Sequence, residues 1–482
     1  MSAAGTKAYR PWTPELYAQQ AHSPAAKLPN DDLVFFVIDV VPKLDLAPIH
    51  APYQDEARGA PPFDPAMMTC LLLYAYCVGV FSSRKIARAC ERNLAFLAIV
   101  GEERPDFRTI SLFRKTHLEA FAGVFVQVLL LAKAAGLVRL GTIAIDGTKV
   151  QGNASRHKAM SYGYMTQEVA RLRAEIDQLL QQAQAVDAQD DAALGCRRGD
   201  ELPEELRRRE DRLAVIEAAM KRLEAAARAA AAAERRRREE AEEERQRTGA
   251  KRRGRAPGPI VETPAAKAQV NFTEPELSIM KAANKGWDCC GNAQASVDDG
   301  CQIILACDVT AECNDKRQAE PMAQATRSQL DQAGMARAAE PTEARPPIPA
   351  ALDTGYFSAE AVAALEREGF DPHIATERQR HHVATGPVAP ESEPAPEPAT
   401  AKEKMQAKLK TPAGRAIYAR RKVIAEPVFG QIKEARGFRR FLLRGLAQIR
   451  GEWRLVCLTH NLLKIWRHGN GPLRSSGCAL IN

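Results

Sequence analysis

The segment 141–150 (GTIAIDGTKV) constrains the fold most, because its composition indicates a buried β-strand that carries a charged side chain. Short runs of β-branched and apolar residues are typical of strands inside a sheet. Asp146 interrupts this run, and a carboxylate in so apolar a segment requires a reason. One reason is a strand-end carboxylate that projects into a crevice and binds a metal ion. The other is an aspartate that caps a turn or a helix, and the residues alone leave both open.

Further strands are predicted downstream, and one of them repeats this pattern. Residues 292–310 (NAQASVDDGCQIILACDVT) indicate a β-hairpin that turns at 298–300. A strand over 347–353 ends in Asp353 and is followed by a helix over 358–368, and a fourth short strand covers 370–376. Strands that alternate with helices predict an α/β fold with a mixed central sheet. On adjacent strands, Asp146 and Asp353 could share one metal ion.

Residues 31–137 precede the first strand and are dense in apolar residues at helical spacing. Asp64 stands before Pro65 as a helix cap, Ser82 opens a second helix, and Asp106 opens a third. We therefore expect an all-helical N-terminal domain over 31–137, preceded by a flexible lead over 1–30.

A segment of different character, 165–260, separates the first strand from the hairpin. Apolar residues recur there at three- to four-residue spacing in two stripes, one of Val169, Leu172, Ile176 and Leu179 and one of Leu213, Ile216, Met220 and Leu223. This pattern predicts an antiparallel, coiled-coil-like helical hairpin, followed by a basic linker at 251–255. A coiled-coil scaffold protein is one hypothesis for the chain, but it leaves the acidic motifs unexplained.

The last third is helical and basic, and it follows a Pro- and Ala-rich segment over 383–410 that is predicted to be disordered. Tyr418, Lys422 and Glu426 share one helix face by their spacing. Pro427 predicts either a kink or a new helix that begins there. Glu426 is then a third candidate metal ligand, or an ordinary surface glutamate paired with a neighbouring Lys or Arg.

Bulk composition excludes some classes of protein. The chain has 482 residues, enough for two to four domains, with a formal net charge of +8 that suits a polyanionic partner. It contains no apolar run long enough to span a membrane, and its first residues lack a signal core. The eleven cysteines are an odd number and do not form a zinc or disulfide pattern. We expect an intracellular protein with reduced thiols and no membrane partner.

Several motifs together resemble bacterial insertion-sequence transposases of the DDE class, in the branch with a Tyr-Arg-Glu-Lys signature. They are 144–149 (AIDGTK), 153–160 (NASRHKAM), 271–275 (NFTEP), 292–295 (NAQA), 353–358 (DTGYFS), 426–433 (EPVFGQIK) and 436–441 (RGFRRF). In the helical part, 81–84 (FSSR) and 109–114 (TISLFR) are similar to the DNA-binding domain of that branch. The likeness covers most of the chain between residues 30 and 467.

The resemblance implies an RNase H-like catalytic domain over 138–164 and 261–467, interrupted by the coiled-coil insertion at 165–260 and followed by a tail over 468–482. It implies that Asp146, Asp353 and Glu426 are catalytic and hold Mg²⁺, with Mn²⁺ as a substitute. Tyr418, Arg421 and Lys433 match the rest of the signature. Four residues separate Arg421 from Glu426, one more than usual, so Arg420 and Lys422 are alternatives to Arg421. Thr354 stands where alanine is more common.

The implied function is metal-dependent cleavage and strand transfer of an insertion sequence in the bacterial cytoplasm, on nucleoid DNA. The implied partners are the terminal inverted repeats and target DNA, bound by a homodimer on paired ends. The candidate DNA-binding residues are Arg84, Arg114, Tyr418, Arg421, Lys422, Lys433, Arg439 and Arg440. Two alternatives remain: an RNase H-like metal nuclease without strand transfer, and a DNA-binding derivative that has lost activity.

Overall fold

The computed structural model describes residues 9–15, 23–53, 61–194, 204–249, 256–282, 286–335, 346–377 and 400–469. Its contacts divide the chain into two compact units, residues 1–151 with 291–482 and residues 152–290. The first unit contains the sheet with the acidic residues, and the second contains the predicted hairpin insertion.

The N-terminal part of the first unit is helical, as predicted. Asp64 accepts hydrogen bonds from the backbone N–H groups of Ala66 and Met67 and so caps a buried helix, and Asp106 caps another in the same way. Ser82 is the N-cap of a third but makes no side-chain cap bond. The helices are α2 (Leu33–Val40), α3 (Ala47–His50), α4 (Pro65–Cys77), α5 (Ser83–Arg92), α6 (Leu94–Val100), α7 (Phe107–Thr116) and α8 (Ala120–Ala134).

The predicted strands form one mixed sheet, which confirms the α/β fold and its RNase H-like order. Strands follow in the order β4, β5, β1, β7, β8, with β6 also paired to β5. β4 was not predicted, and it belongs to the second unit. β1 is parallel to β7 and β7 to β8, whereas β5 and β6 form the predicted antiparallel hairpin. The strands of this sheet are β1 (Ile143–Gln151), β4 (Ser278–Lys281), β5 (Trp287–Asp298), β6 (Ile304–Thr310), β7 (Ile348–Leu352) and β8 (Phe370–Ile374).

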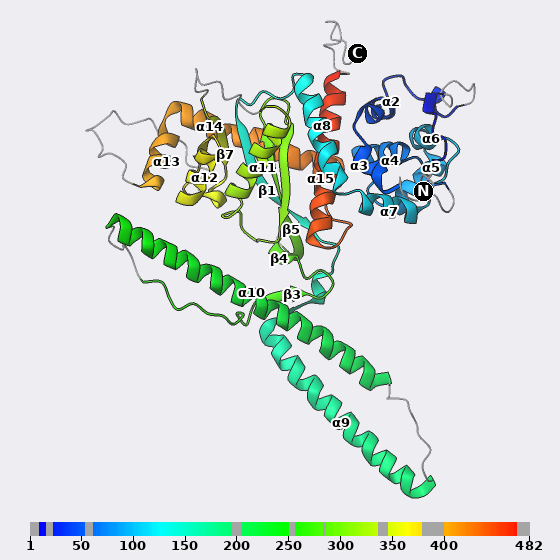
Figure 1. Cartoon of the computed structure of the whole chain (residues 1–482), viewed down its shortest axis with the longest axis vertical. Coiled ribbons are helices and arrows are strands. Elements are labelled where there is room, and N and C mark those ends of the chain that lie inside the picture. The colour runs from blue at the N-terminus through cyan, green and yellow to red at the C-terminus, as the bar shows by residue number, and fades with distance from the viewer. Residues whose placement is uncertain are drawn as a thin grey trace, which may run out of the picture. The chain divides into compact units, whose positions relative to one another are not determined.

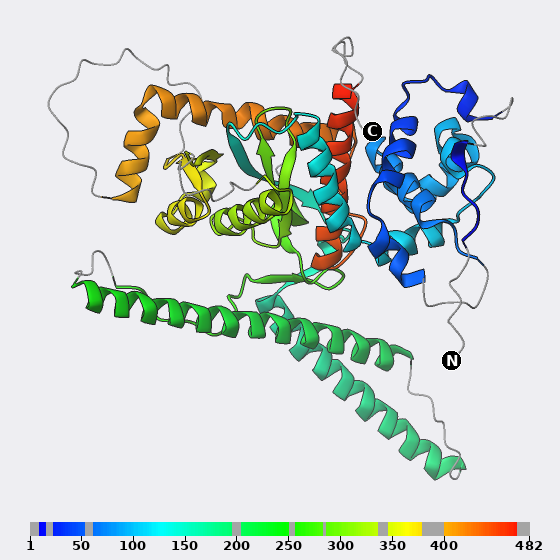
Figure 2. The same ribbon diagram turned by 45° about the horizontal axis from the view of Figure 1, so that its top comes forward.

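Helices of the C-terminal half cover this sheet, and Figure 1 shows them around the strands. α11 and α12 pack on each other and on β6 and β8, and α14 packs along β1, β7 and β8. α15 packs on β6 and also on α8, which lies beside it in Figures 1 and 2. Their bounds are α11 (Ala319–Gln332), α12 (Ala359–Arg367), α13 (Ala401–Lys410), α14 (Pro412–Gly430) and α15 (Leu446–Gly469), with a π-helical turn η6 (Gln431–Ala435) directly after α14.

The prediction of disorder over 383–410 is wrong for the C-terminal part of that segment. Thr400 and Glu403 form a reciprocal capping box that starts α13 at Ala401, and α13 continues to Lys410. Residues 383–399 lie outside the described residues, as do the basic linker at 251–255 and most of the 468–482 tail.

A buried ionic network ties the N-terminal helices to α15. The Tyr76 hydroxyl donates to Glu452 Oε1 at 3.3 Å, and Arg114 Nη1 donates to Tyr76 Oη at 3.1 Å and to the Phe81 carbonyl at 2.9 Å. Glu452 Oε2 accepts from the backbone N–H of Leu442 and Leu443. Burial raises the pKa of Glu452, and the Arg114 charge opposes that shift.

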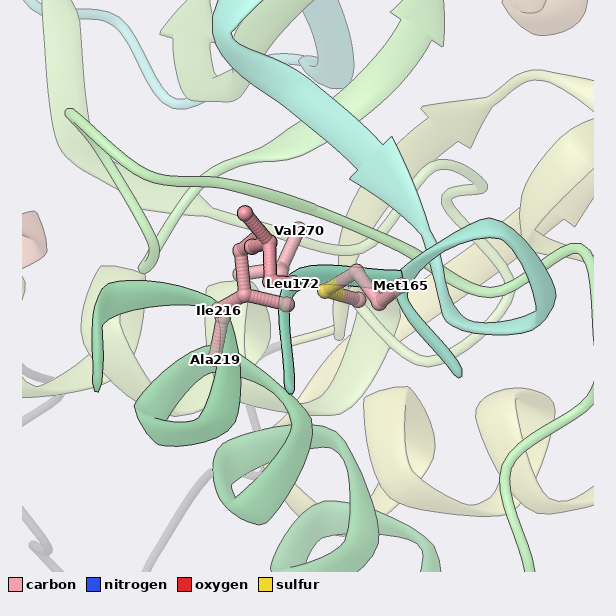
Figure 3. Close-up of a cluster of buried hydrophobic side chains, with 5 residues drawn as sticks. All are labelled: Met165, Leu172, Ile216, Ala219 and Val270. Carbon is pink, nitrogen blue, oxygen red and sulfur yellow. The ribbon is translucent and has the colours of Figure 1, made fainter. Parts of the chain in front are cut away.

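The second unit contains the predicted antiparallel helical hairpin, formed by α9 (Tyr162–Leu194) and α10 (Glu204–Thr248). Figure 3 shows the apolar side chains that join the helices to the short strand β3 (Gln269–Asn271), which pairs with β2 (Ala159–Ser161). The buried cluster is Met165, Leu172, Ile216, Ala219 and Val270. Ion pairs flank it, with Arg212 at 2.8 Å from Glu168 and Arg173 at 2.7 Å from Glu217.

Within the described residues, no single helix is both long and apolar enough to cross a membrane, although α7 and α8, which meet at 77°, reach that length and hydropathy as a pair. The cysteines in this part of the chain are all free thiols, most of them buried, while Cys313 is exposed.

Candidate active site

Two parallel strands bring the predicted aspartates together. Asp146 is in β1, and Asp353 directly follows β7, where it is the N-cap of the short 3-10 helix η5 (Thr354–Tyr356). In the parallel register Ile145 is opposite Leu352. The next residue of each strand is the aspartate, so the sheet register itself sets Asp146 beside Asp353.

Glu426 comes from α14, which runs without a break through Pro427. The prediction that a new helix begins at Pro427 is therefore wrong. A proline inside a helix leaves the carbonyl four residues before it without its usual donor. That carbonyl belongs to Val423, and it accepts a hydrogen bond of 3.0 Å from the Gln302 side chain. This bond from the β5–β6 turn lets Glu426 stay in helical geometry.

One guanidinium joins the three carboxylates. Arg421 Nη1 lies 3.3 Å from Asp146 Oδ2, and Nη2 lies 3.9 Å from Asp353 Oδ1 and 3.7 Å from Glu426 Oε1. The neighbouring candidates point elsewhere. Arg420 pairs with Asp299 at 2.7 Å, and Lys422 is exposed. The geometry thus selects Arg421 from the three alternatives that the irregular spacing left open.

The three carboxylates differ in burial. The exposed fraction of the side chain is 17% for Asp146, 50% for Asp353 and 55% for Glu426, and the Arg421 side chain between them is 11% exposed. Burial raises the pKa of Asp146 to about 6, and the charges of Asp353 and Asp315 add to the rise. The Gly147 N–H, which donates to Asp146 Oδ1 at 2.8 Å, and Arg421 oppose it.

The donor set suits a hard divalent cation in its chemistry. Carboxylate oxygens are the ligands that Mg²⁺ prefers, and here three of them converge on one positive group. In the arrangement described, no group of three His, Cys, Asp or Glu side chains among the described residues is close enough to hold a metal ion. The Arg421 guanidinium lies where the carboxylates would meet.

Sequence reasoning missed a polar cluster next to this site. Asp315 lies between β6 and α11, and its Oδ1 accepts hydrogen bonds from the Asn292 and Gln294 side chains at 2.7 and 2.8 Å. Gln294 also accepts from the Tyr356 hydroxyl, and both of these side chains are buried. The only sequence signal was the resemblance of 292–295 and 353–358 to the transposase motifs. Nothing in the sequence singled out Asp315.

The other candidates on the C-terminal helices lie around the site. Lys433 Nζ donates to Thr148 Oγ1 at 2.5 Å and to the Lys149 carbonyl at 2.7 Å, so it contacts β1 just after Asp146. Tyr418, one turn before Arg421, is half-buried, and burial raises its pKa. Arg439 pairs with Glu434, and Arg440 contacts the Gln151 side chain at 3.3 Å. Both arginines are exposed, and their binding to DNA stays a prediction.

The two N-terminal candidates have different surroundings. Arg84 is exposed on α5, with its guanidinium 5.1 Å from the centre of the Phe107 ring. Arg114 is only 4% exposed and is held by Tyr76 and the Phe81 carbonyl. The prediction that Arg114 binds DNA is therefore wrong, because its charge is used inside the core.

Comparison with known families agrees with this fold. Residues 392–466 match the family described as transposase DDE domain, and residues 22–116 match the family described as transposase domain (DUF772). No curated protein and no solved structure shows a match. An RNase H-like sheet that gathers two aspartates and a glutamate defines a class of DNA-processing enzymes. Within that class, the two family matches support an insertion-sequence DDE transposase.

Proposed function

We propose that the chain catalyses divalent-metal-dependent cleavage of DNA at the ends of an insertion sequence and transfers those ends to target DNA. The observation that carries the proposal is the convergence of Asp146, Asp353 and Glu426 on Arg421. Three acidic side chains from separate elements are held there around a single positive charge at the edge of a mixed sheet.

The acidic residues have the role of metal ligands in this proposal. Asp146, Asp353 and Glu426 hold Mg²⁺, which Mn²⁺ can replace. A divalent ion held by these three residues would supply activation of water or of a DNA 3′-hydroxyl and stabilisation of the leaving oxygen in an in-line displacement. Asp146 is the most buried of the three and keeps a fixed orientation through the Gly147 N–H.

Arg421 changes partners in the proposed cycle. Its guanidinium offsets part of the negative charge of the three carboxylates in the arrangement described, and it is matched in shape and charge to a phosphate. When metal and DNA enter, Arg421 turns to a DNA phosphate near the scissile bond, and the carboxylates are freed for the metal. Tyr418 and Lys422 contact the backbone on either side of it, and Lys433 holds β1.

The exposed basic residues bind the DNA backbone, with little information about base sequence. Arg439 and Arg440 serve the strand near the catalytic site, and Arg84 serves the terminal inverted repeat on the N-terminal helices. We propose that two copies act on paired ends, on nucleoid DNA in the bacterial cytoplasm.

The decisive experiment incubates the full chain with duplex DNA that carries the terminal inverted repeat and with a target plasmid, in Mg²⁺ or Mn²⁺. The proposal expects nicking at the repeat and joining to the target, both lost in Asp146→Asn. Nicking without joining would instead support the metal nuclease. Binding without nicking by the wild-type chain would overturn the catalytic proposal and support the inactive derivative.

A further inference from the structure

A fourth carboxylate lies behind the acidic triad. Asp315 enters from the loop between β6 and α11, and only one of its oxygens, Oδ1, accepts the side-chain amides of Asn292 and Gln294, at 2.7 and 2.8 Å. Lys149 Nζ lies 3.9 Å from the same oxygen. An ionised carboxylate only accepts hydrogen bonds, so it fixes both amides with their N–H groups toward it.

Gly147 leaves the space that this cluster fills, and Gly355 lies in ordinary contact distance of it. A Cβ on Gly147, the residue after Asp146, would lie 2.2 Å from Gln294 Nε2 and 2.9 Å from Asp315 Oδ1. A Cβ on Gly355, two residues after Asp353, would lie 3.6 Å from Asp315 Oδ2. Asp315 and Gln294 therefore stand directly against the backbone that carries both aspartates of the triad.

Gln294 extends the contact to the second aspartate's loop. Its Oε1 accepts from the Tyr356 hydroxyl, and Tyr356 belongs to η5, the turn that Asp353 caps. The Gln294 backbone carbonyl also accepts from Trp453 Nε1 at 3.0 Å, which anchors this point of β5 to α15. The chain of bonds from Asp315 through Gln294 to Tyr356 thus joins the β1 and β7 ends of the site.

We propose that Asp315 is a positioning residue of the acidic centre. It holds Gln294, and through it Tyr356, so that Asp146 and Asp353 keep the separation that a shared divalent ion requires. This inference rests on the proposed metal-dependent function of the triad. Residues that orient metal ligands change metal affinity even though they do not touch the ion.

The hydrogen-bond pattern provides a sharp pair of variants. Asp315→Asn keeps an Oδ1 acceptor for both amides and places its NH₂ toward Gly355, so it preserves the positions and removes the charge. Asp315→Ala removes the acceptor altogether. Asp331→Ala is the control for loss of an acidic residue. Asp331 lies on α11, shortly after Asp315 in the chain, and forms an ion pair with Arg327.

The probe is Mn²⁺ alone, with binding to the full chain measured by electron paramagnetic resonance and folding checked by thermal melting. We expect Asp315→Ala to bind Mn²⁺ roughly 10- to 100-fold more weakly, Asp315→Asn to recover most of that loss, and Asp331→Ala to match the wild type. Folded Asp315→Ala with wild-type Mn²⁺ affinity would overturn the inference, as would Asp315→Asn that is no better than Asp315→Ala.

A double variant tests whether Asp315 acts through Gln294. Residues of one hydrogen-bond network are not additive, so Asp315→Ala combined with Gln294→Leu should bind Mn²⁺ no more weakly than the worse single variant. Losses that multiply would show that the two side chains act separately. Mn²⁺ binding without any DNA cleavage by the wild type rejects the proposed function alone, whereas a wild-type chain that binds no Mn²⁺ rejects both.

Discussion

Arg421 Nη1 lies 3.3 Å from Asp146 Oδ2, and this contact links the signature helix α14 to the first strand of the sheet. The same guanidinium is also within reach of Asp353 and Glu426. A single side chain therefore contacts all three carboxylates of the triad and offsets part of their charge, and its removal has measurable consequences.

Arg421→Ala should destabilise the metal-free chain. Asp146 is largely buried and loses a charged hydrogen bond, at a cost of roughly 1–3 kcal/mol, while the half-exposed Asp353 and Glu426 add little. Urea unfolding gives the difference in free energy. Lys422→Ala, the exposed neighbour, is the control and should stay within about 0.5 kcal/mol of the wild type. Equal stability of the two variants would show that the Arg421 contacts are not formed in solution.

The stability of the metal-free chain should depend on the charge of Asp146. Its pKa is raised from 3.8 to about 6 in the folded chain. The protonated form is thus favoured by folding, so this contribution is fully present below the ordinary pKa and is lost as the pH rises through 6. Asp146→Asn, which keeps the neutral form, should gain about 3 kcal/mol relative to the wild type between about pH 4 and pH 8.

Urea unfolding of wild type and Asp146→Asn at several pH values checks this expectation. The informative quantity is the difference between the two proteins, because other titrating groups cancel in it. A difference that does not change with pH would mean that folding leaves the pKa of Asp146 unchanged.

Substitutions of Arg114 and Arg84, both predicted to bind DNA, should have different effects on stability and on DNA binding. Arg114→Ala removes a buried guanidinium that donates to Tyr76 and to the Phe81 carbonyl, and each lost charged hydrogen bond should cost roughly 1.5–3 kcal/mol of stability. Arg84→Ala loses a contact with Phe107 worth about 1 kcal/mol or less, but should reduce the salt dependence of DNA binding by about one unit of slope. Thermal unfolding and fluorescence anisotropy at several salt concentrations measure both. A stable Arg114→Ala chain with impaired DNA binding would reverse this assignment.

Packing of the helical hairpin can be tested with adjacent residues. Ile216 is buried in the cluster of Figure 3, whereas Val215 beside it is 51% exposed. Ile216→Ala should destabilise the α9–α10 pair by about 2–5 kcal/mol, and Val215→Ala should change it by less than about 0.5 kcal/mol. Limited proteolysis within 162–248 reports the loss. Similar proteolysis of the two variants would place the helix contact on another face.

Local patterns predicted most of the helices and strands, because strand composition, helix caps and apolar periodicity depend on residues that are close together in the sequence. Asp64, Asp106 and the stripes of α9 and α10 are examples. Contacts between residues far apart in the sequence could not be predicted in this way. Arg114 is indistinguishable in sequence from a surface arginine, and only the fold brings Tyr76 and Glu452 to it. Asp315 matters through residues that lie far from it in the chain.

Pro427 illustrates the same limit. Its neighbours predict a disturbed helix, since proline removes a backbone donor. The Gln302 side chain, more than a hundred residues away, donates to the Val423 carbonyl in place of that backbone donor. No local sequence pattern predicts this bond. Arg421 and Arg420 likewise point about 100° apart around the helix, and only the fold shows that Arg420 meets Asp299 while Arg421 meets the carboxylates.

The repair of the helix at Val423 has a mechanical consequence. Since α14 is uninterrupted from Pro412 to Gly430, Arg421 and Glu426 are fixed on one helix. Asp146 and Asp353 are fixed on the sheet by the β1–β7 register. The centre is thus an assembly of two stiff parts. A small shift of α14 along its axis would move Arg421 and Glu426 away from the two aspartates together. The contacts that hold α14 in place therefore also determine whether the three carboxylates come together.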